Sequence, residues 1–115
     1  MARKRLPTRR PNLTATAEWR DNAVHVTVGL DASGAVREVF ARAQRSESEI
    51  DLVVDDVGVL LSLALQNDVT LAEVTHSMGR LPDGRPASVV ALVADVALRV
   101  EAELRGPVLV AGGAP

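Results

Sequence analysis

The stretch "LTATAEWRDNAVHVTVGL", residues 13–30, decides the fold of this chain, because it holds two alternating segments joined by a short polar turn. Apolar side chains recur at every second position on both sides of the turn, at Leu13, Ala15, Ala17, Trp19, Val24, Val26, Val28 and Leu30. A strict period of two is typical of half-buried strands. The stretch therefore predicts an antiparallel pair of strands with the turn at Asp21-Asn22.

A third strand follows in "AVREVFARA", residues 35–43, after a turn over residues 31–34. Its alternation is less regular than that of the first two segments. The chain has only two aromatic residues, Trp19 and Phe40, and we expect Phe40 to anchor this strand in the core.

Beyond Ala43 the apolar period changes to that of helices. Ser46 and Glu49 have the spacing of a capping box, and apolar residues then recur at helical spacing as far as residue 65. Thr70 and Glu73 form a second capping box, which predicts a short helix that stops at Gly79.

Ser88 starts a third predicted helix, which we expect to end at Gly106-Pro107. The predicted fold is α+β, with a three-stranded antiparallel sheet followed by three helices packed on one face. We expect one domain over residues 13–106, a basic extended arm at 1–12 and a flexible tail at 107–115.

Positive charge is concentrated at the beginning of the chain. The net charge is −2, yet five basic residues and no acid lie within residues 1–10, so the rest carries about −7. These basic residues are Arg3, Lys4, Arg5, Arg9 and Arg10. Three roles fit such an arm: it binds a nucleotide or nucleic acid, it docks on a protein partner, or it is a solvated tail.

A second candidate binding segment is "RLPDGRP", residues 80–86, where Arg80 and Arg85 flank a glycine turn. Two arginines placed in this way could hold a phosphate from two sides, and the alternative is an ordinary connection between helices. Asp51 and Asp55 lie one helical turn apart and are interpreted as part of a solvated acidic face.

Composition excludes several classes of function. The chain contains no cysteine, so it forms no disulfide, thiolate zinc site or thiol redox centre. His25 and His76 are isolated, and we expect neither metal nor other cofactor. No apolar run reaches the ~20 residues that span a membrane, and no secretory signal follows the basic start. We therefore expect a cytoplasmic protein without membrane contact.

Four segments together resemble the TSCPD-domain family: "RKRLPTRR", "REVF", "LLSLALQNDVTL" and "GRLPDGR". Members of that family form the C-terminal domain of adenosylcobalamin-dependent (class II) ribonucleotide reductases or stand alone. The positions that match are Arg3, Arg5, Leu6, Pro7, Arg9, Arg10, Glu38, Phe40, Ser48, Asp56, Ser62, Leu63, Ala64, Leu65, Gln66, Arg80, Gly84 and Arg85. Glu47 stands where the family tends to have glycine, and the cysteine motif that names the family is absent.

The resemblance implies a role in deoxynucleotide metabolism. Ribonucleotide reduction needs a cysteine radical and a reducing cysteine pair, so we expect no catalytic residue and no enzyme activity here. The favoured hypothesis is an accessory module that binds a protein partner, a nucleotide or a nucleic acid through the arm and the loop that holds Arg80 and Arg85. The alternative is a structural domain without a ligand that associates with a second copy through its valine-rich helix faces.

Overall fold

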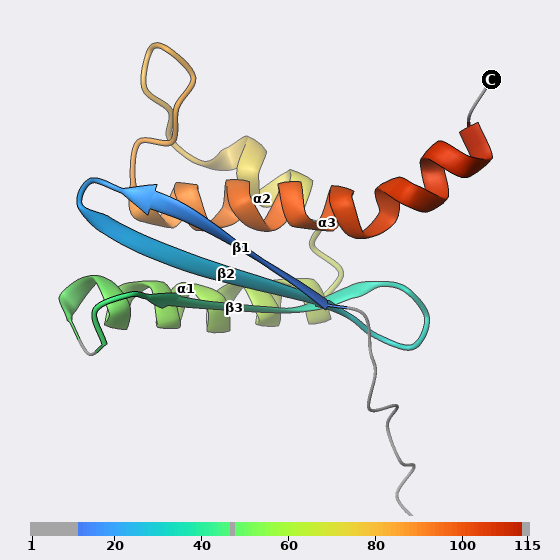
Figure 1. Ribbon diagram of the computed structural model, residues 1–115, viewed down its shortest axis with the longest axis horizontal. Helices are drawn as coiled ribbons and strands as arrows, with labels where there is room; N and C mark the ends of the chain where they lie inside the picture. Colours follow the sequence, from blue (N-terminus) through green and yellow to red (C-terminus); the bar gives the residue numbers. More distant parts are fainter. Residues whose placement is uncertain (1–11, 47, 114–115) are drawn as a thin grey trace, which may run out of the picture.

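The computed structural model describes residues 12–46 and 48–113, with side chains as far as Arg105. Three antiparallel strands, β1 (Asn12–Trp19), β2 (Asn22–Leu30) and β3 (Val36–Ala43), form a sheet in the order β1-β2-β3. Helices α1 (Glu49–Gln66), α2 (Leu71–Ser77) and α3 (Val89–Gly113) follow (Figure 1). The predicted α+β fold with three strands before three helices is confirmed.

The core lies between one face of the sheet and the helices. On β2, Val24, Val26 and Val28 are fully buried, whereas His25 and Thr27 between them face the other, open side. Helix α3 packs on β1 and β2, α1 packs along β3, and α2 packs mainly on α3 (Figure 1). The alternation in the sequence thus separates a covered face of the sheet from an open one.

Helix α1 covers the outer edge of β3, where a fourth strand would otherwise pair. The Ser62 hydroxyl accepts a hydrogen bond from Val39 N (2.9 Å) and donates one to Val39 O (3.1 Å). Nearer the start of α1, Asp51 Oδ1 accepts from Ala43 N at 2.8 Å. These side chains satisfy backbone groups that would otherwise leave an open sheet edge.

Phe40 is not a core residue, and that prediction was wrong. Its side chain is 58% exposed, whereas its neighbours Val39 and Ala41 are buried. The register shifts beside Gly29, which pairs with Glu38, and Leu30, which pairs with Val36. β3 therefore has one extra residue between Val36 and Glu38. Each later residue of β3 faces the side of the sheet opposite to the one that strict alternation predicts. Phe40 consequently lies on the open side of the sheet.

The predicted start of α1 was two residues early. Ser48 is the N-cap, and its hydroxyl accepts from Asp51 N at 3.2 Å. Asp51 itself is only 2% exposed and accepts from Arg42 Nε and a terminal Arg42 nitrogen, both at 3.0 Å. Its assignment to a solvated acidic face is therefore corrected. A start at Ser48 places Asp51 where it reaches β3.

The other helix boundaries follow the capping residues more closely. The capping box of Thr70 and Glu73 is confirmed, because each backbone N–H donates to the other side chain. Ser88 Oγ accepts from Ala91 N at 3.1 Å, as expected for the start of α3. Helix α3 continues to Gly113 rather than ending at residue 106. A proline within a helix removes one hydrogen bond and bends the axis, and α3 changes direction near its end (Figure 1).

Candidate functional site

The loop between α2 and α3 is a small hairpin. Arg80 and Pro86 form an isolated bridge, and Leu81 N donates to Arg85 O at 2.8 Å. Gly84 N donates to Leu81 O at 2.8 Å, and Gly84 has a φ of +90°, a conformation that favours glycine. The sequence Pro-Asp-Gly thus folds into a tight turn that holds Arg85 at a fixed place.

Arg80 holds this hairpin against the helices. Its two terminal nitrogens donate to the two carboxylate oxygens of Asp95 on α3, each at 2.6 Å. One of them also donates to Thr75 O on α2 at 3.2 Å. The Asp95 carboxylate raises the pKa of Arg80 above its ordinary value. A planar guanidinium engaged on several sides in this way positions the loop.

Arg85 has a more open environment. Its Nε donates to Asp83 Oδ2 at 2.6 Å, and its side chain is 73% exposed. The Arg85 backbone N–H and side chain stabilise the Asp83 carboxylate and lower its pKa. Arg80 and Arg85 thus pair with different carboxylates, and the terminal nitrogens of Arg85 have no partner among the described residues. Of the two predicted loop arginines, Arg85 is the one with donors to offer a ligand.

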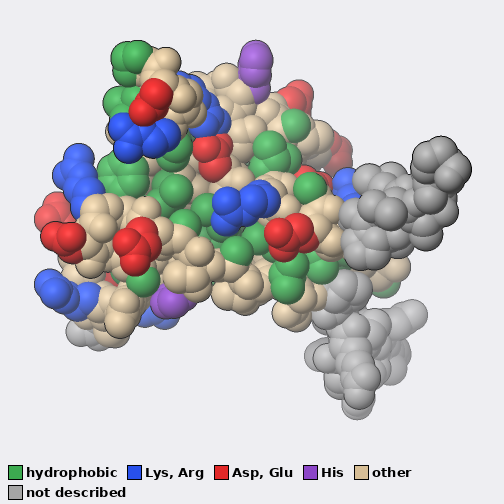
Figure 2. Space-filling view, turned by 45° about the horizontal axis from the view of Figure 1, so that its top comes forward, with side chains coloured by type: hydrophobic (Ala, Val, Ile, Leu, Met, Phe, Trp, Pro, Cys, Tyr) green, Lys and Arg blue, Asp and Glu red, His purple; other side chains and the backbone are tan. Residues whose placement is uncertain are grey.

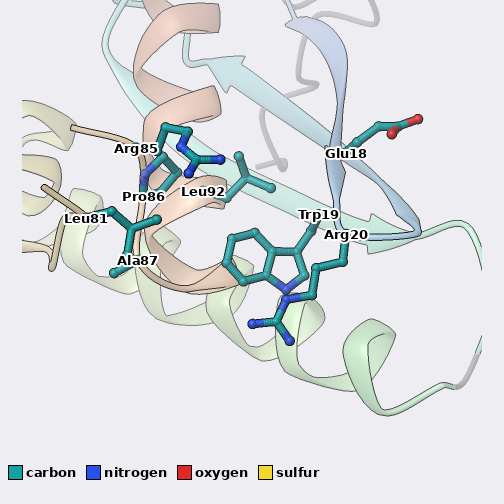
Figure 3. A pocket seen from close by; sticks show the side chains of 8 residues that line it. All are labelled: Glu18, Trp19, Arg20, Leu81, Arg85, Pro86, Ala87 and Leu92. Carbon is teal, nitrogen blue, oxygen red and sulfur yellow. The ribbon is translucent and has the colours of Figure 1, made fainter. Parts of the chain in front are cut away.

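A hollow of about 440 Å³ lies between this hairpin and the turn that joins β1 to β2. Figure 3 shows the Trp19 ring on one side of it and loop and helix residues opposite. The lining residues are Glu18, Trp19, Arg20, Leu81, Arg85, Pro86, Ala87 and Leu92. Small-molecule sites commonly have volumes of about 300–1,000 Å³ and mainly apolar walls. The hollow has the volume and the apolar lining of such a site, and Arg20 and Arg85 add positive charge to it.

Arg20 belongs to the hollow because of the turn in which it lies. It has a φ of +57°, as hairpin turns of two residues between strands require. Its guanidinium carbon stands 5.2 Å from the centre of the Trp19 ring, a cation–π contact. Neither Trp19 nor Arg20 was predicted to belong to a binding site. The only tryptophan of the chain, directly followed by arginine at a turn, is the signal that would have found them.

The surface around the hollow mixes positive and apolar side chains. Figure 2 shows Lys or Arg side chains beside hydrophobic ones at the end of the molecule where the hairpin rises. Acidic groups lie next to them, which include Asp83 in the hairpin and Glu18 in the hollow. In Figure 3 the Glu18 carboxylate points away from the Trp19 ring. The inner wall of the hollow is therefore apolar and cationic.

A second exposed surface, which we call the outer α1 face, consists of apolar side chains. Its members are Phe40, Leu52, Val59, Leu60 and Leu63, each of which is more than half exposed. Four of them lie on the side of α1 away from the core, so the helix is apolar nearly all round. Exposed apolar patches of this kind mark contact sites for other molecules.

The remaining predicted site residues all belong to the basic arm: Arg3, Lys4, Arg5, Arg9 and Arg10 lie outside the described residues. The two histidines, for which no metal was expected, lie on separate elements. His25 Nδ1 is 2.8 Å from Thr16 Oγ1 on the open face of the sheet, and His76 lies on α2. Within residues 12–46 and 48–113 no three His, Cys, Asp or Glu side chains are grouped as metal ligands. No helix in this part of the chain is long and apolar enough to cross a membrane.

Comparison with known families decides what this chain is related to. The family model for the TSCPD domain matches residues 2–99 of the 115 residues. The chain belongs to the TSCPD domain family. Comparisons with curated proteins and with solved structures gave no match.

The fold explains several positions at which the sequence resembles the TSCPD pattern. Ser48 caps α1, and Ser62 binds the edge of β3. Arg80 ties the hairpin to α3, and Gly84 supplies its positive φ. These residues stabilise the fold of this chain, whereas the side chains of Arg85 and Phe40 are mostly exposed.

Proposed function

We propose that this TSCPD protein is a non-catalytic accessory module of deoxynucleotide metabolism that binds a nucleotide in the hollow beside Trp19. The observation that carries the proposal is the meeting of Trp19, Arg20 and Arg85 around a hollow of about 440 Å³. An aromatic and apolar wall suits a nucleobase, and guanidinium groups suit its phosphates. The metabolic assignment rests on the resemblance to the C-terminal domain of class II ribonucleotide reductases.

The basic arm has a defined part in this proposal. Its five basic residues add positive charge to a chain that is otherwise acidic. We expect them to increase the affinity for the phosphates, in a manner that weakens as salt screens the charges. The dependence on salt is therefore expected to decrease when the arm is removed.

Trp19 allows the binding to be measured directly, since it is the only tryptophan of the chain and lines the hollow. We expect deoxynucleoside triphosphates to quench its fluorescence. Replacement Arg85→Ala should weaken binding about tenfold or more, since hydrogen bonds to charged groups contribute about 1.5–3 kcal/mol. Arg99→Ala, at an exposed position further along α3, is the matched control and should leave the affinity unchanged.

The comparison that completes the experiment is the chain that begins at Asn12. Weaker binding of this shorter chain at low salt supports a role of the arm. Absence of quenching by all four deoxynucleotides at millimolar concentration contradicts the nucleotide proposal. Equal affinities of the Arg85→Ala and Arg99→Ala variants would place any binding elsewhere.

The outer α1 face favours a second candidate, the docking of a protein partner. Its exposed leucines and Phe40 provide the apolar centre that protein interfaces usually have. Purified class II ribonucleotide reductase is the partner to test, by surface-immobilised binding. Leu63→Glu should abolish binding, and Leu81→Glu, on the other side of the molecule at the hollow, is the control. Binding that survives Leu63→Glu contradicts docking at this face.

A further inference from the structure

The two edges of the sheet differ. The outer edge of β3 is bound by Ser62 and Asp51 of α1. The outer edge of β1 has no such cover among the described residues, and its Thr14, Thr16 and Glu18 are exposed. An uncovered strand edge of eight residues is able to pair with another strand.

The hydrogen bonds of the sheet show which residues of β1 face this edge. Gln44 N donates to Ala23 O, so the backbone groups of Ala23 point toward β3. Because these groups alternate sides along an antiparallel strand, those of Val24, Val26 and Val28 point toward β1. They pair with Ala17, Ala15 and Leu13. The N–H and C=O groups of Thr14, Thr16 and Glu18 therefore point outward.

No hydrogen bond within residues 12–46 and 48–113 reaches the outward backbone groups of Thr14, Thr16 and Glu18. The side chains of Thr14 and Thr16 instead bond across to β2, to Thr27 Oγ1 at 2.6 Å and His25 Nδ1 at 2.8 Å. These contacts hold β1 flat on its own sheet and leave its edge available.

We infer that β1 pairs antiparallel with β1 of a second copy, centred on Thr16, to form a continuous six-stranded sheet with a two-fold axis. Residues opposite each other in such a pair must lie on the same face of the sheet. In this register Thr16 is opposite Thr16 of the second copy, and Thr14 is opposite Glu18. All three residues with outward backbone groups then have partners.

The side chains are self-complementary in this register. On the helix-covered face, Leu13 is opposite Trp19 and Ala15 is opposite Ala17, so large apolar groups meet each other and small groups meet each other. Leu13 is 36% exposed in the single copy and gains an aromatic neighbour. On the open face Glu18 meets the Thr14 hydroxyl and not another carboxylate. Registers shifted by one pair place Leu13 or Trp19 against an alanine and lose the largest contact.

Pairing also extends the hollow. Trp19 lines the hollow, so Leu13 of the second copy comes to lie beside its wall. Asn12, the first described residue, is opposite Arg20 of the other copy. The point at which the arm joins β1 in each copy therefore lies next to the hollow of the other copy.

The first experiment is sedimentation of the full chain without ligand at high micromolar concentration. We expect twice the chain mass of 12.2 kDa. Thr16→Pro removes an outward N–H, which an edge strand tolerates, and should give a monomer with unchanged circular dichroism. The emission of Trp19 should shift to longer wavelength in this variant, because its partner Leu13 is lost. Leu63→Glu, on the outer α1 face, should remain a dimer.

The absence of cysteine allows a second test that does not depend on Thr16→Pro folding. Thr16→Cys should cross-link to itself through a short bifunctional thiol reagent. Thr27→Cys lies on the same face of β2, opposite Thr14. Its two copies would be three strand spacings apart across the sheet and four residues apart along it, which gives roughly 19 Å. It should cross-link far less.

Each outcome supports or overturns the inference. A full chain that is monomeric overturns the inference. This holds even if the shorter chain from Asn12 dimerises, because the arm would then cover the β1 edge of its own copy. If Leu63→Glu dissociates the dimer and Thr16→Pro does not, the dimer is formed by the outer α1 face and not by β1. Equal cross-linking of the two cysteine variants overturns the register. Neither test uses a nucleotide, so failure here is distinct from failure of the proposed function.

Discussion

Asp31 organises the loop between β2 and β3 with its carboxylate. Its Oδ1 accepts from Ser33 N (2.8 Å), Ser33 Oγ (2.6 Å) and Ala35 N (3.0 Å), and its Oδ2 accepts from Arg37 Nε (3.1 Å). The Ser33 hydroxyl, the Ala35 N–H and Arg37 all favour the ionised form. The pKa of Asp31 is consequently far below its ordinary value.

This shift makes the stability of the protein depend on pH. A carboxylate whose pKa is depressed by folding contributes stability above its unfolded pKa, about 3.9, and loses it as pH falls toward the folded value. We expect the thermal midpoint to decrease between pH 5 and pH 2. Asp31→Asn should lower the midpoint at pH 7 and make the decrease at acidic pH smaller. Thermal unfolding followed by circular dichroism at several pH values measures both effects.

Asp55→Asn is the control, since this exposed aspartate of α1 makes none of these loop contacts. Its midpoint should follow that of the unaltered chain at every pH. An Asp31→Asn profile that runs parallel to the unaltered one down to pH 2 would show that Asp31 has no part in the acid response.

At the scale of single elements, α1 depends on a glycine. A Cβ added to Gly58 would stand 3.0 Å from Val39 O and 3.3 Å from Ala41 N, both backbone atoms of β3. The helix therefore lies against the strand more closely than any side chain would allow. This close approach brings Ser62 into hydrogen-bonding distance of Val39.

Gly58→Ala should destabilise the protein although alanine is the better helix former. The intrinsic preference contributes about 1 kcal/mol in favour of alanine, whereas overpacking against a fixed backbone costs about 1–3 kcal/mol. We expect a net loss of up to about 2 kcal/mol in the free energy of unfolding, measured in urea. Gly79→Ala, whose added carbon would stand 3.7 Å from Ala87 Cβ, should change it little. A Gly58→Ala variant more stable than the unaltered chain would contradict the close packing.

The elements show what sequence patterns predict and where they fail. Alternation in β1 and β2 predicted both strands, because each residue there faces either core or solvent. It failed at Phe40, since the shift of register after Gly29 depends on pairing with another strand. The helical spacing of Asp51 and Asp55 failed to predict the burial of Asp51 for a similar reason: only the folded chain brings Arg42 and Ala43 to that carboxylate. Contacts between distant segments leave no local period to detect.

The candidate site was predicted in part for the same reason. Arg85 was found from its turn, which is a local signal. Trp19 and Arg20 were missed, because 60 or more residues separate them from the loop that closes the hollow. Arg80 was expected to bind ligand, and its pairing with Asp95 is again a contact between separate elements.

At the scale of the whole molecule, Arg80 connects three parts of the chain. It joins the hairpin, through Gly84 O at 3.4 Å, to Thr75 O of α2 and to the Asp95 carboxylate of α3. The hairpin supplies one wall of the hollow and the β1–β2 turn supplies the other. The shape of the hollow therefore depends on a contact outside it.

Arg80→Lys should loosen the hairpin without unfolding the protein. A lysine keeps the charge but cannot reach both Asp95 oxygens and two carbonyl groups at once. We expect the amides of Leu81, Gly84 and Ala87, which are hydrogen-bonded within the loop, to exchange at least about threefold faster. Amides of β2 should keep their protection, as measured by hydrogen exchange. Arg85→Lys, whose ion pair lies within the hairpin, is the control and should leave Ala87 unchanged. Unaltered exchange of all three loop amides in Arg80→Lys would show that the hairpin holds its own shape, and the hollow would then not depend on Asp95.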